Sequence, residues 1–129
     1  MKKTALVTGA GRRFGFELSK ALLAEGYQLF AHYNSSRDGI SELESLGATA
    51  VQADFTDIES IQGMIKTISN ATDSIELLVN NASCFFDNET VDNDNKALAA
   101  VFQVHGIAPY MLISGLQQQL SQSENGLVI

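Results

Sequence analysis

One glycine-rich turn organises this sequence: Thr8-Gly9-Ala10-Gly11-Arg12-Arg13-Phe14-Gly15. It ends the short apolar run Thr4–Thr8, which predicts a buried strand, and it opens an amphipathic helix expected from about Phe14 to Glu25. Glycines at such a turn let the backbone approach a pyrophosphate, and the N–H groups at the helix start then hold the anion. The turn therefore predicts a dinucleotide site, with an ordinary strand–helix connection as the alternative.

The rest of the chain continues to alternate between strand-like and helical patterns. Further strands are expected at Gln28–Tyr33, Thr49–Ala53, Glu76–Asn80 and Leu127–Ile129, and helices at Ser36–Leu46, after the N-cap Asp57, and after a polar loop Asp87–Asn95, with a kink at Pro109. Such alternation implies parallel strands joined by right-handed crossovers. The predicted fold class is α/β: a Rossmann-type doubly wound parallel sheet in three αβα layers. It forms a single domain over residues 1–129, truncated after the start of the fifth strand.

Composition limits the partners. The 129 residues are 45% hydrophobic and carry a net charge of −7, which argues against general binding to nucleic acid or to an anionic membrane. Cys84 is the single cysteine, so a reducing, cytoplasmic setting is expected. No run of about 18 apolar residues occurs, so no membrane span is expected. The adjacent Arg12 and Arg13 form a local basic cluster in an acidic protein.

The choice of cofactor depends on the residues that follow the second strand. They are His32-Tyr33-Asn34-Ser35-Ser36, and no carboxylate occurs before Asp38. Proteins that bind NAD usually place an acidic residue there for the ribose hydroxyls, whereas NADP binders supply a basic residue for the 2′-phosphate. Because Arg12, Arg13, Ser35 and Ser36 are placed to contact a phosphate, NADPH (NADP) is the predicted cofactor. Ser36 could instead be the N-cap of the following helix.

Three motifs in this order resemble the short-chain dehydrogenase/reductase family: Thr8-Gly9 through Gly15, then Asp54 in Ala53-Asp54-Phe55, then Asn80-Asn81-Ala82-Ser83. The resemblance covers the whole chain, which corresponds to the first half of a family member. It implies that Asp54 and Phe55 border the adenine and that Asn81, Ala82 and Ser83 line the nicotinamide side. As alternatives, Asp54 could compete with Asp57 as a helix cap, and the asparagines could only tie strands together.

The full set of expected cofactor residues follows from the turn, the second strand and the resemblance. It comprises Gly9, Gly11, Arg12, Arg13, Phe14, Gly15, His32, Tyr33, Asn34, Ser35, Ser36, Asp54, Phe55, Asn81, Ala82 and Ser83. No metal ligands are predicted.

Two departures from the family pattern are similar to the pteridine reductases and the bacterial dihydromonapterin reductases. Arg13 replaces the middle glycine of the turn, and Ser83 replaces the last glycine of the Asn-Asn-Ala-Gly motif. The resemblance implies that Arg13, Ser83 and Phe85 contact a pterin-like substrate, with Phe85 stacking on it. Phe85 and Phe86 could alternatively be core residues. His105 stands where the family commonly has an asparagine of the proton relay, and either a relay role or an ordinary helical histidine fits.

The catalytic pair of the family, Tyr-x-x-x-Lys, does not occur in this chain. Four residues after Tyr27, Tyr33 and Tyr110 stand Ala31, Arg37 and Ser114. The resemblance thus implies a fragment without catalytic residues, inactive alone, of an NADPH-dependent reductase that acts on a C=N or C=O bond of a small flat substrate. The rival hypotheses are a general carbonyl reductase for acyl or sugar carbonyls and a non-enzymatic dinucleotide-binding module. A small-molecule substrate and self-association into a homo-oligomer are the expected partners.

Overall fold

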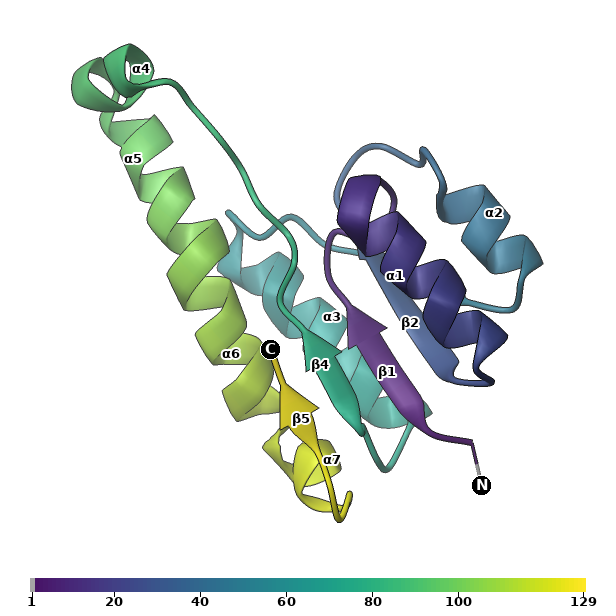
Figure 1. Cartoon of the computed structure of the whole chain (residues 1–129). Coiled ribbons are helices and arrows are strands. Elements are labelled where there is room, and N and C mark those ends of the chain that lie inside the picture. Colours follow the sequence, from purple (N-terminus) through teal and green to yellow (C-terminus); the bar gives the residue numbers. More distant parts are fainter. Residues whose placement is uncertain (1) are drawn as a thin grey trace.

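The computed structural model describes residues 2–129, apart from the side chains of Asn88 and Val91, and it contains a five-stranded parallel sheet between helical layers (Figure 1). The strands are β1 (Thr4–Val7), β2 (Gln28–Tyr33), β3 (Thr49–Gln52), β4 (Leu77–Val79) and β5 (Leu127–Val128). Their order across the sheet is β3-β2-β1-β4-β5, and all four pairings are parallel. The Rossmann-type fold predicted from the sequence is confirmed.

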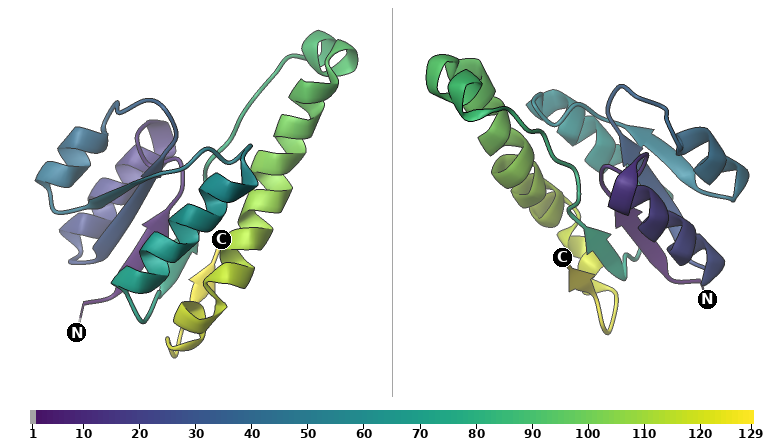
Figure 2. Two further views of the ribbon diagram at one scale, coloured as in Figure 1. Left: turned by 180° about the vertical axis from the view of Figure 1, so that it is seen from behind. Right: turned by 45° about the horizontal axis from the view of Figure 1, so that its top comes forward.

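Helices cover both faces of this sheet (Figure 2). Helices α1 (Arg13–Ala24) and α2 (Ile40–Ser45) pack on one face, and α3 (Ile58–Ala71) and α6 (Ala108–Gly115) pack on the other. Two short helices, α4 (Asn88–Asn93) and α7 (Gln117–Ser121), precede and follow the long helical run Asn95–Gly115. Helix α5 (Asn95–Phe102) continues the direction of α6 and extends beyond the sheet toward α4 (Figure 1). Successive side chains of a strand point to opposite faces, so Ala5 and Val7 join the core under α1 while Leu6 joins the core under α3.

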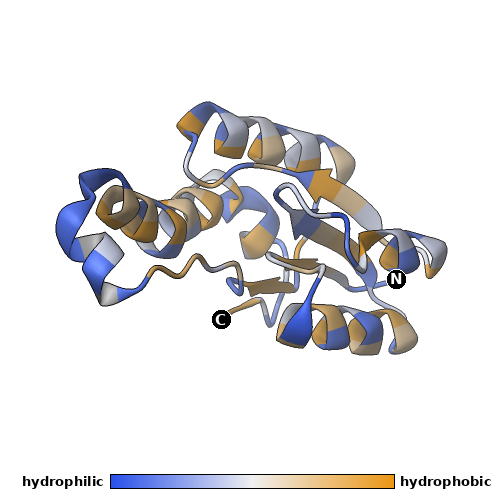
Figure 3. Cartoon of the chain, turned by 90° about the horizontal axis from the view of Figure 1, so that it is seen from above, coloured by the Kyte–Doolittle hydropathy of each residue, from blue (hydrophilic) through white to orange (hydrophobic). Residues whose placement is uncertain are grey.

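The strand order predicts that a ligand site lies at the carboxyl edge of the sheet. From β1 the chain winds to β2 and β3 on one side, then returns to β4 and β5 on the other. The connections that leave β1 and β4 therefore diverge, and in such folds ligands bind in the crevice between them. Seen from above, the strands carry both apolar and polar residues, whereas the outlying α4 is mostly hydrophilic (Figure 3).

Two local predictions are wrong. The helix expected from Ser36 begins only at Ile40, because Gly39 has a left-handed φ of +74°. Ser36 is not its N-cap, since the Ser36 hydroxyl accepts from the Asp38 N–H at 3.2 Å. The expected polar loop Asp87–Asn95 contains α4, capped by the Asp87 carboxylate, which accepts from the Thr90 N–H at 2.7 Å. Asp57, by contrast, is confirmed as the N-cap of α3.

The long helical run Asn95–Gly115 is interrupted before Pro109 by a π-helical turn, Gln103–Ile107, in which the Ala108 N–H bonds to the Gln103 carbonyl. Contrary to expectation, this run is long and apolar enough to cross a membrane by length and composition alone. Val104, Ala108 and Leu112 on its inner side are buried in the core with α3. Only 22% of the apolar window in this run is buried, and a single helix of this kind is weak evidence for a membrane span.

Candidate functional site

A cavity of about 500 Å³ opens at the carboxyl ends of β1, β2 and β4. Its walls are Gly9, Gly11, Arg12, Arg13, Phe14, His32, Tyr33, Asn34, Ser35, Ser36, Asn81, Ala82, Ser83 and Phe85. The structure thus brings together the residues named from the sequence for cofactor and substrate, except Gly15, Asp54 and Phe55. Among the described residues no carboxylate lines this cavity, and Arg12 and Arg13 supply its only full charges.

The turn after β1 is shaped by close backbone packing. Gly9 has a φ of +62°, and a Cβ there would lie 2.9 Å from the Ala82 Cα. A Cβ on Gly15 would overlap the Gly9 carbonyl oxygen and lie 2.5 Å from the Asn81 Nδ2. Gly15 therefore lies behind the turn rather than on the cavity wall, and it allows the segment after β4 to support the turn from below.

Arg13 adopts a conformation that normally belongs to glycine. Its φ is +54°, the only positive φ among non-glycine residues within residues 2–129. A non-glycine residue in the left-handed region costs on the order of 1–3 kcal/mol and occurs mostly at ligand sites. The strain brings an exposed guanidinium to the cavity wall at the start of α1.

Thr8 and Asn81 connect the ends of β1 and β4. The buried Thr8 hydroxyl oxygen accepts from the N–H groups of Asn81 and Ala82, both at 2.9 Å. The Asn81 Nδ2 donates to the carbonyls of Thr8 at 3.2 Å and Gly9 at 3.0 Å. Asn81 thus ties the two strand ends together and also lines the cavity, so its contact with a cofactor stays a prediction. Sequence reasoning did not predict that the Thr8 hydroxyl connects the two strand ends. The position of Thr8, directly before the first glycine of the turn, could have suggested it.

Substituting Thr8 by valine should lower the free energy of unfolding by about 2 kcal/mol, because two partly buried N–H groups would lose their acceptor. Urea unfolding measures the change. Thr4→Val makes the same substitution at another buried threonine, the first residue of β1, whose hydroxyl makes no hydrogen bond to the described residues, and it should change the free energy of unfolding by no more than about 0.5 kcal/mol. Equal losses in the two variants would contradict the role given to the Thr8 hydroxyl.

His32 lies under the turn, and the residue is only 3% exposed. Its Nδ1 accepts from the Gly9 N–H at 3.1 Å, and its Nε2 donates to the Ala53 carbonyl at 2.9 Å. Burial lowers the pKa of His32 to about 4, against the opposing effect of the Ala53 hydrogen bond. The imidazole is therefore neutral, with its proton on Nε2.

Phe55 and Asp54 stand just outside the cavity. The buried Phe55 ring stacks on His32 with 4.1 Å between ring centroids, so it supports the histidine. The Asp54 carboxylate accepts from the Thr56 hydroxyl at 2.7 Å and from the Thr56 N–H at 2.9 Å, and these bonds hold the pKa of Asp54 below its ordinary value. Contacts of Phe55 and Asp54 with adenine stay a prediction.

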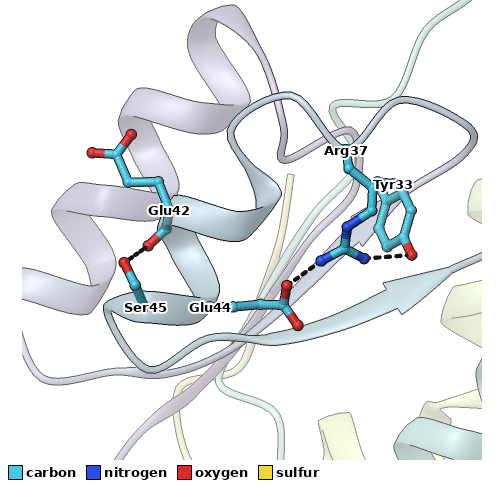
Figure 4. A network of polar contacts seen from close by, with 5 residues as sticks. All are labelled: Tyr33, Arg37, Glu42, Glu44 and Ser45. Carbon is cyan, nitrogen blue, oxygen red and sulfur yellow. Dashed lines mark hydrogen bonds and ion pairs between the residues drawn. The ribbon is translucent and has the colours of Figure 1, made fainter.

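Tyr33 is held from behind by a polar network that sequence reasoning missed (Figure 4). Arg37 donates to the Tyr33 hydroxyl at 2.8 Å, lies 5.1 Å from the centre of its ring, and pairs with the Glu44 carboxylate. In the same view, the Ser45 hydroxyl donates to the Glu42 carbonyl at 2.6 Å. The network fixes one wall of the cavity beside Asn34 and Ser35.

The segment after β4 forms the opposite wall. Phe85 is 89% exposed, which excludes the alternative that it is a core residue. The Nε2 of His105, on the π-helical turn, lies 3.1 Å from the Cys84 carbonyl and 3.3 Å from its N–H. Burial raises the pKa of the Cys84 thiol, in keeping with a small packing residue rather than a nucleophile.

Comparison with known proteins agrees with the sequence and the fold. The family model for short chain dehydrogenases matches residues 3–129. A dihydromonapterin reductase of Enterobacter sp. (strain 638) is 30% identical over 119 residues, which cover 92% of this chain and 50% of that protein. The 3-oxoacyl-[acyl-carrier-protein] reductase FabG of Staphylococcus aureus is 35% identical over 94 residues, covering 68% of this chain and 38% of that protein.

A solved structure shares the fold closely. It is FolM alternative dihydrofolate reductase 1 from Brucella canis in complex with NADP, with a TM-score of 0.84, 30% identity, and coverage of 98% of this chain and 53% of that one. The chain spans about half the length of the curated relatives it matches. Motifs, fold and family match agree: this chain belongs to the short chain dehydrogenase family.

Proposed function

We propose that this chain holds NADPH in the cavity above β1 and β4, as the cofactor-binding part of a reductase acting on a small, flat, pterin-like substrate. The observation that carries the proposal is the lining of the cavity. It offers Arg12, Arg13, Ser35 and Ser36, and no carboxylate from the described residues. A site built for NAD usually places an acidic side chain at the end of β2, where this chain has Asn34 and Ser35.

The residues present fit a phosphorylated dinucleotide. The glycines of the turn let its backbone pack closely against Ala82 and Asp38, and the N–H groups at the start of α1 would face an anion favourably. The arginines and serines would hold the 2′-phosphate through charge-assisted hydrogen bonds. Asp54, ionised at neutral pH, would border the adenine. When bound, NADPH supplies the hydride that reduces a C=N or C=O bond.

Two features support a pterin-like substrate. The exposed Phe85 ring offers a flat apolar face on the cavity wall, which suits stacking on a heteroaromatic ring. Arg13 supplies a donor group in the same cavity. The names of two similar proteins, a dihydromonapterin reductase and an alternative dihydrofolate reductase, are in keeping with this substrate class.

A general carbonyl reductase is the second candidate, favoured by the identity to a 3-oxoacyl reductase. Titrating the NADPH-loaded chain with a dihydropterin and with a 3-oxoacyl thioester separates the two. Pterin binding that is lost in Phe85→Ala supports the first candidate, and binding of the thioester alone supports the second. Because the chain contains no Tyr-x-x-x-Lys, we expect it to bind cofactor without turnover. NADPH oxidation by the pure chain would contradict that expectation.

We further infer that the protein is cytoplasmic and self-associates. The long helix exposes several large apolar side chains, namely Leu98, Phe102, Ile107, Tyr110 and Ile113. Such a surface favours association between copies of a chain.

The substitution Arg13→Gly should weaken cofactor binding without lowering the free energy of unfolding. Its NADPH dissociation constant should rise about tenfold, because charge-assisted bonds to phosphate are lost. Its free energy of unfolding should stay unchanged or rise by up to about 1 kcal/mol, because glycine tolerates a φ of +54°. Calorimetric titration and urea unfolding measure the two quantities. Wild-type affinity in this variant would exclude Arg13 from the phosphate site.

A further inference from the structure

We propose that His32 is a positioning residue of the cofactor site: its neutral imidazole, protonated on Nε2, fixes the Gly9 N–H and thereby the shape of the phosphate-binding turn. The inference rests on the proposed function in assuming that the turn receives the cofactor phosphates. His32 is not part of the turn itself and belongs to the next strand, β2.

The geometry allows one tautomer. The Ala53 carbonyl, 2.9 Å from Nε2, can only accept, so Nε2 must carry the proton. The Gly9 N–H, 3.1 Å from Nδ1, can only donate, so Nδ1 must present its lone pair. The stacked Phe55 ring, tilted by only 7° from the imidazole, holds the plane in which both bonds form.

His32 holds the turn at two successive residues. Its side chain accepts from the Gly9 N–H, and its own carbonyl accepts from the Ala10 N–H at 2.9 Å. Gly9 is the residue at which the chain turns with a φ of +62°. Losing the Nδ1 acceptor would leave the Gly9 N–H without its partner and would free this peptide to rotate. The N–H groups that follow, up to the start of α1, would then lose their alignment toward a phosphate.

The surroundings of the His32 ring keep it neutral and protonated on Nε2. Ionisable side chains on the segments packed against it are Arg12 and Arg13 on the turn, Tyr33 on its own strand and Asp54 after β3. The polar partners of the imidazole are backbone groups, which do not titrate. Burial also holds the pKa of His32 near 4. His32 therefore acts as a fixed acceptor over the physiological pH range.

Long-range ¹⁵N–¹H NMR spectra of the labelled wild-type chain test the tautomer without any ligand. His32 should show the Nε2–H form and should remain unprotonated down to about pH 5, with His105, the other histidine of the chain, as an internal comparison. A Nδ1–H tautomer, or titration at the ordinary pKa of about 6.5, would overturn the proposal.

Two substitutions test whether His32 positions the Gly9 N–H or only fills space in the core. His32→Asn keeps an acceptor oxygen at the place of Nδ1, whereas His32→Leu fills the space without any acceptor. The affinity for NADP⁺ should fall by no more than about fivefold in His32→Asn and by about 30-fold or more in His32→Leu, since an unpaired donor weakens the turn. Equal affinities, or tighter binding by the leucine variant, would mean that His32 only fills space.

Ile68→Val, a small core truncation in α3 far from the turn, is the control for lost stability and should keep its NADP⁺ affinity within about twofold. If His32→Leu does not fold, the NMR spectra of the wild-type chain still test whether His32 holds Gly9. They report the tautomer of His32 and whether the Gly9 amide signal changes when His32 becomes protonated. A wild-type chain that bound no NADP⁺ would refute the proposed function, whereas the role of His32 in holding Gly9 would be decided by the NMR result.

Discussion

Gly15→Ala is expected to weaken NADPH binding by at least about 100-fold. The new Cβ would overlap the Gly9 carbonyl oxygen and lie 2.5 Å from the Asn81 Nδ2, so the turn and the segment after β4 must move apart. Both lie at fixed strand ends, and neither is the flexible end of a long side chain. Opening the turn by even a fraction of an ångström misaligns the N–H groups at the start of α1 from a bound phosphate.

A fluorescence titration that follows the reduced nicotinamide measures this loss. Gly63→Ala is the matched control, because a Cβ on Gly63 in α3 meets nothing within 4 Å. It should leave NADPH affinity unchanged and raise the free energy of unfolding by roughly 0.5–1 kcal/mol, as expected for removing a glycine from a helix. NADPH affinity within threefold of wild type in Gly15→Ala would show that the turn does not bind the cofactor as described.

Acidification should lower the free energy of unfolding of this protein through His32. Its pKa is about 4 in the folded chain and about 6.5 when unfolded, so the unfolded state binds the additional proton as the pH falls between these values. The stabilisation is fully present above pH 6.5 and is lost as the pH falls toward 4. Between pH 7.5 and 4.5 the loss from this one group is roughly 2.5 kcal/mol.

Urea unfolding at pH 7.5 and pH 4.5 measures this loss. His32→Asn removes the titrating group and should show a loss smaller by roughly 2 kcal/mol, whereas His105→Asn should keep the wild-type difference. Asp54 and Asp87, whose pKa values are lowered by bonds to Thr56 and Thr90, add losses of the same sign at lower pH. An unchanged pH dependence in His32→Asn would contradict the burial and bonding of this histidine.

Much of the site could be predicted because parallel strands place their carboxyl ends at one edge of the sheet. The turn after β1, Tyr33–Ser36 after β2 and Asn81–Phe85 after β4 are distant in sequence, and the strand order alone brings them to one cavity. A local pattern for each strand end was therefore enough to find them. Most of the site could therefore be predicted once the chain was assigned to a parallel α/β sheet.

Other features depend on orientation or on single bonds that no sequence pattern contains. Phe55, in the turn that follows β3, lies inward against His32 and away from the cavity. The capping carboxylate of Asp87 stabilises the start of α4, in a segment whose composition is that of a loop, and Asp94 caps the start of α5. The pairing of Arg37 with Glu44 spans a loop and a positive-φ glycine, so helical spacing gave no signal.

A competition between NADPH and NADH for the purified wild-type chain tests most directly whether this turn is built for a 2′-phosphate. NADPH should bind at least about tenfold more tightly, and the difference should shrink as salt screens the arginines. In Arg13→Gly the preference should fall toward equality. Equal affinities in the wild-type chain, or a preference for NADH, would contradict the assignment of Arg12, Arg13, Ser35 and Ser36 to a phosphate site.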